Sequence, residues 1–279
     1  MKFLSYLTPE GYKSYGILKG EGIIDLKIRT DINTPDLKSF IRENGIEAAD
    51  RFINTDTNYS LSEITFLPVI DNPGKILCVG MNYQKKRDEF SATSDAPTIF
   101  IRFPDSQTAH LGEIVKPALS EQLDYEGELV IVIGKAGLSI PPENAFDHIA
   151  GYSCYMDGSV RDWQHTWFTA GKNWSKTGGF GPWLVTRDEI SDPQQLQLKT
   201  WLNGEIVQQD STANMVHSIN KIISYVSTFT QLSPGDVILT GSPGGVGRSR
   251  NPPLFLNHGD IIEVEIESVG RLKNHVVST

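Results

Sequence analysis

Three acidic residues occupy every second position before a long apolar run. Asp124, Glu126 and Glu128 belong to the segment "LDYEGELVIVIGK" (123–135), and the apolar, mostly β-branched residues Leu129–Ile133 follow them. Side chains alternate between the faces of a strand, so the three carboxylates share one face if the strand begins that early. Carboxylates that approach a buried region repel one another and lose hydration. They therefore need a cation or hydrogen-bond donors.

A divalent cation is one solution, because oxygen-only ligands suit Mg²⁺, Mn²⁺ or Ca²⁺ better than zinc. Glu126 and Glu128 alone leave an octahedral site incomplete, and Asp157 is the best third ligand. It follows the strand-like segment "HIAGYSCYM" and precedes Gly158. Asp124 is the weakest of the acidic row and could instead cap a turn or orient a neighbour. The alternative is a Glu-x-Glu pair on an exposed edge strand, solvated and without metal.

The elements around these residues predict a β-rich protein. Residues 1–30 divide into short strands punctuated by glycines, and the apolar spacing over 34–55 favours a helix. The segment "FLPVIDNPGK" (66–75) interrupts the pattern with two prolines and a glycine. We therefore expect a small mixed domain over 1–70 and a larger β-rich domain over 71–279.

Within the larger part, short strands alternate with Gly/Pro turns, and two other segments stand out. "KILCVGMNY" (75–83) is typical of a buried strand that opens into a loop. The polar stretch that follows it would form a lid or a surface connection. A helix is expected near Val216–Thr228.

Composition limits the function classes. The chain has 279 residues, of which 39% are hydrophobic and 21% charged, and its formal net charge of −9 argues against a nucleic-acid partner. No apolar run approaches the ~18–20 residues that span a bilayer. No signal peptide is visible, and the two cysteines, Cys78 and Cys154, are expected to be buried reduced thiols. These observations predict a cytoplasmic protein without membrane or nucleic-acid partners.

Six segments occur in an order and spacing that resembles the fumarylacetoacetate hydrolase family. They are "LDYEGELVIVIGK", "AGYSCYMDGSVRDWQ", "GPWLVT", "LNGEIVQ", "LSPGDVILTGSPGGVG" and "GDIIEVEIESVG". The resemblance covers roughly Lys75 to the C-terminus. It implies an α+β, β-rich fold, namely a mixed β-sandwich roll with a small N-terminal α/β domain. It also implies a homodimer, a small keto or diketo acid as substrate, and a Mg²⁺ or Mn²⁺ site at Glu126, Glu128 and Asp157.

The resemblance also assigns roles around the metal. Gln164 would hydrogen-bond the substrate or an oxyanion, and Lys172 would bring a positive charge to an enolate or a carboxylate. The turn at Thr240 and Gly241 would present a hydroxyl and N–H groups to a substrate carboxylate. Tyr83, in the "GMNY" segment, and Arg161 complete the expected substrate-binding set, although Arg161 could simply hold its loop or pair with a carboxylate.

The sequence departs from the family at the residue that activates water. Family hydrolases usually carry a His and a Glu three residues apart on a lid; here Glu89 stands at the Glu position, but Lys86 replaces the His. A charged ammonium cannot accept a proton. Lys86 could replace the His functionally, Glu89 could act as the base, or the enzyme does not hydrolyse C–C bonds. His110 and His165 are further candidates from neighbouring segments.

The main expectation is a metal-dependent hydrolase that cleaves a C–C bond in a small β-diketo acid through a metal-stabilised enolate. The alternative is an oxaloacetate-type decarboxylase or a keto–enol tautomerase on the same site, because neither reaction needs an activated water. A third interpretation is a catalytically idle relative that serves as a binding or structural protein. The complete set of buried acids argues against it, since an idle site has no physical need to keep buried charge.

Overall fold

The structure is a computed structural model and describes residues 1–30 and 33–279. Four α-helices are found in these ranges: α1 (Leu37–Asn44), α2 (Gln84–Phe90), α3 (Thr169–Lys172) and α4 (Ile219–Phe229). The largest sheet contains β1 (Lys2–Leu7), β2 (Lys13–Lys19), β3 (Gly22–Asp25), β4 (Tyr59–Ser60), β5 (Thr65–Phe66), β6 (Ile76–Gly80), β7 (Thr98–Arg102), β8 (Gln107–Ala109), β11 (Gly127–Ile133), β12 (Ile149–Asp157), β14 (Gly178–Thr186) and β17 (Val237–Leu239). A second sheet contains β9 (Glu113–Lys116), β15 (Gln197–Leu202), β16 (Glu205–Ser211), β18 (Ile261–Ile266) and β19 (Gly270–Ser278), and β10 (Leu123–Asp124) pairs with β13 (Ser159–Val160).

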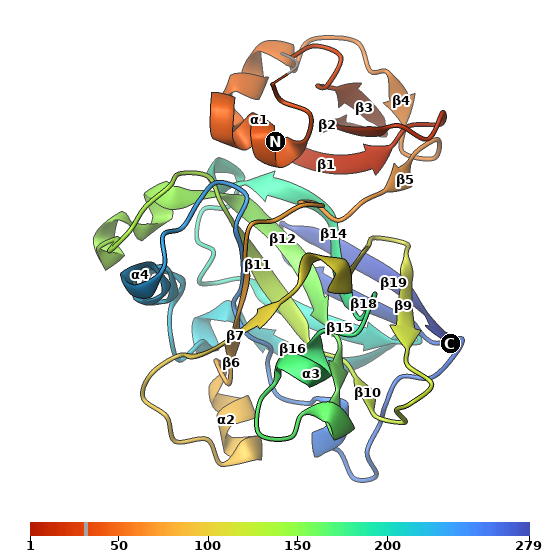
Figure 1. Cartoon of the computed structure of the whole chain (residues 1–279), viewed down its shortest axis with the longest axis vertical. Coiled ribbons are helices and arrows are strands. Elements are labelled where there is room, and N and C mark those ends of the chain that lie inside the picture. The colour runs from red at the N-terminus through yellow and green to blue at the C-terminus, as the bar shows by residue number, and fades with distance from the viewer. Residues whose placement is uncertain (31–32) are drawn as a thin grey trace.

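The two larger sheets form the body of the protein (Figure 1). The large sheet runs in the order β4-β3-β2-β1-β14-β12-β11-β17-β6-β7, and the small one in the order β16-β15-β18-β19-β9. Leu129 and Met156 of the large sheet share a core with Leu198, Val264 and Leu272 of the small sheet. The α+β, β-rich sandwich expected from the sequence is therefore confirmed.

Strand β11 is buried along its whole length, which explains its continuous apolar run. One face meets the small sheet. On the other face, Val130 and Val132 pack in a core with Phe3 and Phe40 from the N-terminal part. Glu128 belongs to this second face, because it lies directly opposite Tyr155 in the β11–β12 pairing and Tyr155 is in the same core.

The N-terminal part continues the large sheet. Strand β1 pairs antiparallel with β14, so hydrogen bonds join residues 1–70 directly to the body of the protein. The predicted domain boundary near residue 70 stays a prediction. Residues on both sides of it, such as Phe3 and Val130, pack in one core. The helix predicted over 34–55 is shorter: α1 ends at Asn44, its C-cap residue Gly45 has φ 75°, and a 3₁₀-helix follows over Ile46–Phe52. The other predicted helix matches α4 closely.

The outer edge of the large sheet is occupied by a side chain. Within residues 1–30 and 33–279, strand β7 pairs with one strand, β6, on one side. On its other side, Asn173 Nδ2 donates to the Ile101 carbonyl at 3.1 Å, and Asn173 Oδ1 accepts from the Phe103 N–H at 2.6 Å. The amide thus bonds to β7 as a neighbouring strand would.

Cys78 and Cys154 are buried free thiols, as predicted. Among the helices that the structure describes, none has the length and apolar character needed to cross a membrane.

Candidate active site and metal centre

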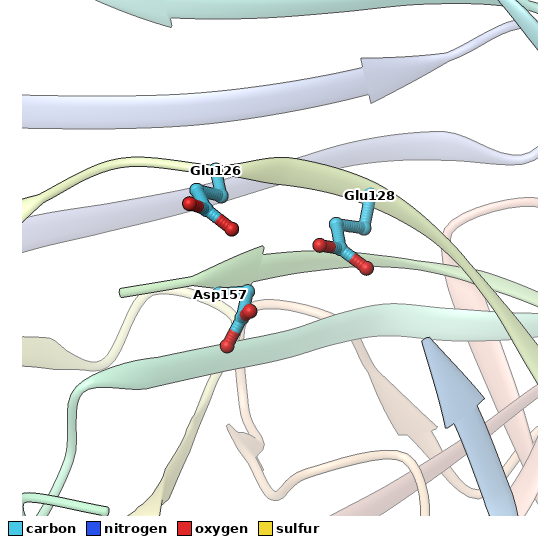
Figure 2. A group of neighbouring side chains, drawn as sticks. All are labelled: Glu126, Glu128 and Asp157. Carbon is cyan, nitrogen blue, oxygen red and sulfur yellow. The ribbon is translucent and has the colours of Figure 1, made fainter. Parts of the chain in front are cut away.

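Glu126, Glu128 and Asp157 converge on one point (Figure 2). Glu126 lies just before β11, Glu128 is its second residue, and Asp157 ends the neighbouring strand β12. The Asp157 N–H donates to the Glu126 carbonyl at 2.8 Å, which fixes the register of the two strands at this end. One carboxylate oxygen from each side chain lies within 4.8 Å of the others, and all three residues are buried. The predicted set of oxygen ligands is therefore brought together.

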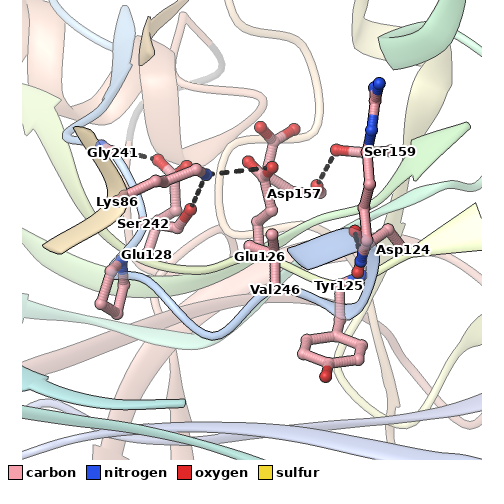
Figure 3. A network of polar contacts seen from close by, with 12 residues as sticks. Lys86, Asp124, Tyr125, Glu126, Glu128, Asp157, Ser159, Gly241, Ser242 and Val246 are labelled. Atoms are coloured by element: carbon pink, nitrogen blue, oxygen red, sulfur yellow. Dashed lines mark hydrogen bonds and ion pairs between the residues drawn. The ribbon is translucent and has the colours of Figure 1, made fainter. Parts of the chain in front are cut away.

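Glu128 is the member of this set that most needs a cation. Its Oε2 accepts a hydrogen bond from the Gly241 N–H at 2.8 Å (Figure 3), and within the described residues it forms no ion pair. Burial, with the nearby charges of Asp157 and Glu126, raises the pKa of Glu128 well above its usual value. A divalent cation between the three carboxylates would remove this penalty, so the residues fit a Mg²⁺, Mn²⁺ or Ca²⁺ ion.

Glu126, by contrast, is surrounded by positive charge. Lys86 Nζ and Arg161 Nη2 lie 3.0 and 2.6 Å from its Oε1, and Lys172 Nζ lies 3.0 Å from its Oε2. Burial alone would raise the pKa of this carboxyl. The charges of Lys172, Lys86 and Arg161 outweigh burial and hold the pKa well below its usual value.

Asp157 is held between two cations. Lys172, the last residue of α3, forms an ion pair with its Oδ2, and Arg102 Nη1 lies 2.6 Å from its Oδ1. Arg102 is fully buried and also donates to the Gly158 carbonyl at 3.1 Å and to Thr177 Oγ1 at 2.8 Å. Sequence reasoning missed Arg102. The signal was present, because an arginine inside the apolar strand "TIFIRF" requires a buried partner.

Lys86 points into the site from α2, the first part of the polar segment expected to form a lid. It is buried, bonds Ser242 Oγ and pairs with Glu126 (Figure 3). Glu89, one helical turn further on, is exposed, and its carboxylate accepts the Gly245 N–H at 2.8 Å. The two side chains thus bind different groups and do not form the base-and-orienter pair of the family hydrolases.

Arg161 and Gln164 lie next to the carboxylates. Arg161 opens a short 3₁₀-helix (Arg161–Trp163) after β13, and its Nη1 donates to Gln164 Oε1 at 3.2 Å. The amide nitrogen of Gln164 is buried, and within the described residues it has no hydrogen-bond partner. It is an unused donor joined to the carboxylates through Arg161, and its predicted contact with substrate stays a prediction.

Tyr83 and Thr240 are both buried beside the candidate site. Tyr83 is fully buried, and burial together with Glu128 and Asp210 raises the pKa of its hydroxyl well above the usual value. The N–H and the hydroxyl of Thr240 both donate to the Leu129 carbonyl, at 3.1 and 2.9 Å, so neither is free in this structure. The Gly241 N–H is taken by Glu128. Substrate binding by these three residues stays a prediction.

The two candidate histidines lie elsewhere. His110 packs edge-on against Phe66, its Nδ1 accepts the Lys273 N–H at 3.1 Å, and burial lowers its pKa to about 4. His165 is exposed beside Trp163. In the part of the chain that the structure describes, neither forms a hydrogen bond or ion pair with the three carboxylates.

The comparisons with known proteins point to the same family as the sequence. The model of the fumarylacetoacetate hydrolase C-terminal domain matches residues 75–277. The chain is 37% identical over 286 residues to oxaloacetate tautomerase fahd2, mitochondrial, of Xenopus laevis, covering 99% of this chain and 89% of that protein. It is 41% identical over 226 residues to oxaloacetate tautomerase YisK of Bacillus subtilis, covering 78% and 75%.

A solved structure supplies a metal-bound relative. It is the maleylpyruvate hydrolase of Sphingobium sp. SYK-6 in complex with manganese(II) and pyruvate, with a TM-score of 0.84, 26% identity, and coverage of 100% of this chain and 99% of that chain. The names of the relatives thus include both tautomerases and a hydrolase, and the tautomerases are the more similar in sequence. Fold and matched length agree: this chain is a member of the fumarylacetoacetate hydrolase family.

Proposed function

We propose that this protein is a divalent-metal-dependent keto–enol tautomerase of a small α-keto dicarboxylic acid such as oxaloacetate. The observation that carries the proposal is the buried Lys86, which pairs with Glu126 where a hydrolase would hold its histidine. Glu89 binds the Gly245 N–H and does not orient a base. Hydrolysis consumes an activated water, whereas tautomerisation only moves a proton. The names of the similar tautomerases support the same choice.

The charge of the site favours a substrate with two carboxylates. The buried cluster contains four acids and four cations, so its formal charge is zero when all are ionised. The acids are Asp124, Glu126, Glu128 and Asp157, and the cations are Lys86, Arg102, Arg161 and Lys172. A divalent cation would add two positive charges. A dianion such as oxaloacetate restores neutrality, whereas an acylpyruvate with one carboxylate leaves one charge unbalanced in a buried site.

Glu126, Glu128 and Asp157 would hold the metal, which supplies positive charge that polarises the keto group of the substrate. Lys172 adds a fixed positive charge. Burial alone would lower its pKa, but Asp157 and Glu126 raise it above its usual value, so this side chain stays an ammonium. It can stabilise negative charge that develops on the substrate oxygen, but it cannot serve as a base.

Lys86 is the proposed proton carrier. In the enol-to-keto direction, an ammonium at Lys86 Nζ donates a proton to C3 of the enol, and the enol hydroxyl returns its proton to Nζ. The lysine is restored, and the substrate is isomerised without gain or loss of atoms. The Ser242 hydroxyl, which bonds Nζ, orients it. A charged lysine thus suits this reaction, although it could not activate water.

Turnover of oxaloacetate tests the proposal. The purified protein with Mn²⁺ or Mg²⁺ should accelerate relaxation of the enol absorbance while NMR shows total oxaloacetate conserved. Metal without protein, and the Glu128→Gln variant with metal, are the controls. Pyruvate formed at the rate of enol decay would identify a decarboxylase. Acetylpyruvate cleaved to acetate and pyruvate, with oxaloacetate untouched, would restore the hydrolase expectation.

A further inference from the structure

Asp124, the first member of the acidic row, does not join the metal ligands. It is fully buried, and each of its oxygens holds two donors. Its Oδ2 accepts from Arg161 Nε at 2.8 Å and from the Arg248 N–H at 3.0 Å. Its Oδ1 accepts from the Gly247 N–H at 2.7 Å. The same oxygen accepts from the backbone N–H of its neighbour Tyr125 at 2.8 Å (Figure 3).

Through Arg161, Asp124 controls the groups that face the ligands. The guanidinium of Arg161 bonds three side chains by three different nitrogens: Asp124 by Nε, Glu126 by Nη2 and Gln164 by Nη1. Asp124 is the anchor that lies away from the metal ligands, so it sets the plane of the guanidinium. The direction in which Nη1 and Nη2 point, and the place of the Gln164 amide, follow from that plane.

Asp124 also fixes the glycine-rich segment 241–248. Backbone N–H groups of this segment hold Glu128 through Gly241 and Asp124 through Gly247 and Arg248. A Cβ at Gly247 would lie 1.8 Å from the Leu254 carbonyl oxygen and 2.7 Å from Asp124 Oδ1, so the backbone can pack against both groups only because this residue is glycine. The segment lacks the lysine of a phosphate-binding loop, and its N–H groups bind the protein's own carboxylates.

We propose that Asp124 is a positioning residue for substrate, acting through Arg161 and Gln164, and is not a metal ligand. The inference rests on the proposed function for the identity of the substrate, but its test does not. Replacing Asp124 by the isosteric Asn keeps the volume and leaves one oxygen as acceptor. Whichever position the amide nitrogen takes, two of the four donors lose their acceptor, and the Arg161 guanidinium loses the negative charge that anchors it.

Binding experiments on Asp124→Asn provide the test, with Mn²⁺ and pyruvate as probes. Isothermal titration should show Mn²⁺ affinity within about threefold of the unmodified protein, and pyruvate affinity of the Mn²⁺-loaded protein weakened by about tenfold or more, the size expected for a lost charged hydrogen bond. The KM for oxaloacetate should rise by a similar factor, with a smaller change in kcat. Asp162→Asn is the matched control, because Asp162 is exposed and, among the residues that the structure describes, accepts only from Ser120 Oγ, at 2.6 Å.

A second variant separates positioning from general damage. Arg161→Lys keeps the charge beside Glu126 but cannot bond three side chains at once. It should weaken pyruvate binding and keep Mn²⁺ binding, and adding Asp124→Asn to it should cost little more, because both act on the same group. It also supplies the test if Asp124→Asn alone does not fold.

The outcomes are distinguishable from failure of the proposed function. Loss of Mn²⁺ binding in Asp124→Asn would make Asp124 a ligand, and unchanged pyruvate binding in either variant would remove the positioning role. If the unmodified protein binds Mn²⁺ and pyruvate but does not tautomerise oxaloacetate, the proposed function fails, while the binding results still decide the role of Asp124.

Discussion

Lys86 and Glu126 form an ion pair with 3.0 Å between Nζ and Oε1, and both side chains are about 95% buried, with exposures of 4% and 5%. The pair joins helix α2 to the edge of the central strand β11. A cation that binds Glu126 must compete with this ammonium, so in the proposed mechanism Lys86 would influence metal binding as well as proton transfer.

Replacing Lys86 separates these two effects. Lys86→Gln should lower the rate of tautomerisation by about 100-fold, the size of a typical general acid contribution. The same change should tighten Mn²⁺ binding, because a competing positive charge is removed. Steady-state kinetics and isothermal titration measure the two effects, with Lys85→Gln as the control, since Lys85 is exposed on the same helix. A rate within threefold of the unmodified protein would exclude Lys86 as the proton carrier.

Glu128 should be required for the metal but not for the fold. In Glu128→Gln, the rise in melting temperature on adding Mn²⁺ should disappear together with activity. The metal-free variant should be no less stable than the unmodified protein, because the buried carboxylate charge is itself unfavourable there. Differential scanning fluorimetry with EDTA and with Mn²⁺ tests this. Glu121→Gln is the control, because its side chain is 89% exposed. Full activity of Glu128→Gln with Mg²⁺ would refute the ligand assignment.

The raised pKa of Glu128 predicts a pH dependence. In the unfolded chain, Glu128 loses its proton as the pH rises through the ordinary pKa of 4.5. In the folded, metal-free protein the pKa is higher, so Glu128 keeps the proton to a higher pH. This contribution to stability is present below 4.5 and is lost as the pH rises through the folded pKa. Since Mn²⁺ needs the carboxylate, its affinity should increase over the same window, with proton release on binding. Titration calorimetry in buffers of different ionisation enthalpy measures the protons; Mn²⁺ affinity that does not vary with pH would contradict the assignment.

The lowered pKa of Glu126 acts in the opposite direction. Its ion pairs stabilise the protein above the ordinary pKa, and this stabilisation is lost only as the pH falls through the lowered folded value. The two acids therefore make opposite contributions to the pH dependence of stability in the metal-free protein. Of these two contributions, Glu128→Gln should keep only the loss of stability at low pH that is due to Glu126. Urea unfolding across the pH range compares the two proteins.

Lys172 should stabilise the metal-free protein. Its ammonium lies between Glu126 and Asp157, and Lys172→Met leaves two buried carboxylates without that charge. Breaking a buried pair in this way costs about 3–5 kcal/mol. Mn²⁺ should restore part of the loss, because it supplies positive charge to the same carboxylates. The free energy of unfolding in urea, with and without Mn²⁺, measures both effects; equal losses in the two conditions would place Lys172 outside the metal cluster.

Glu89 should matter little for the rate. It is exposed and bonds a backbone N–H, so Glu89→Gln should change stability by less than about 1 kcal/mol and kcat by less than about threefold. Kinetics with oxaloacetate and acetylpyruvate check this. A drop of 100-fold or more with either substrate would instead identify Glu89 as a base.

Residue type and spacing were enough to predict that Glu126, Glu128 and Asp157 lie together, because buried carboxylates at a strand edge need a cation or donors wherever the chain places them. For Asp124, the alternation applied only if the strand began that early, and it does not. Strand β10 ends at Asp124 and β11 begins at Gly127, so the strand geometry is interrupted between them and the first carboxylate turns to Arg161. A break of one or two residues in a strand leaves no trace in an alternating pattern.

The partners of the acids were predicted less completely. Lys172 and Arg161 were found through the family resemblance. Arg102 lies on β7, the last strand in the order of the large sheet, and its contact with Asp157 forms only in the folded protein. The sequence also did not predict that the N-terminal part continues the large sheet, because the pairing of β1 with β14 joins residues more than 180 positions apart. Contacts of such separation depend on topology, which local patterns do not encode.

The amide of Asn173 on the outer strand β7 has a consequence for the folding chain. An edge strand with free N–H and C=O groups is a template on which another chain can add a strand. Asn173 occupies the Ile101 carbonyl and the Phe103 N–H, next to side chains that are themselves apolar and exposed. Asn173, the residue after Lys172, thereby hinders another chain from adding a strand to the β7 edge, whose exposed side chains are apolar.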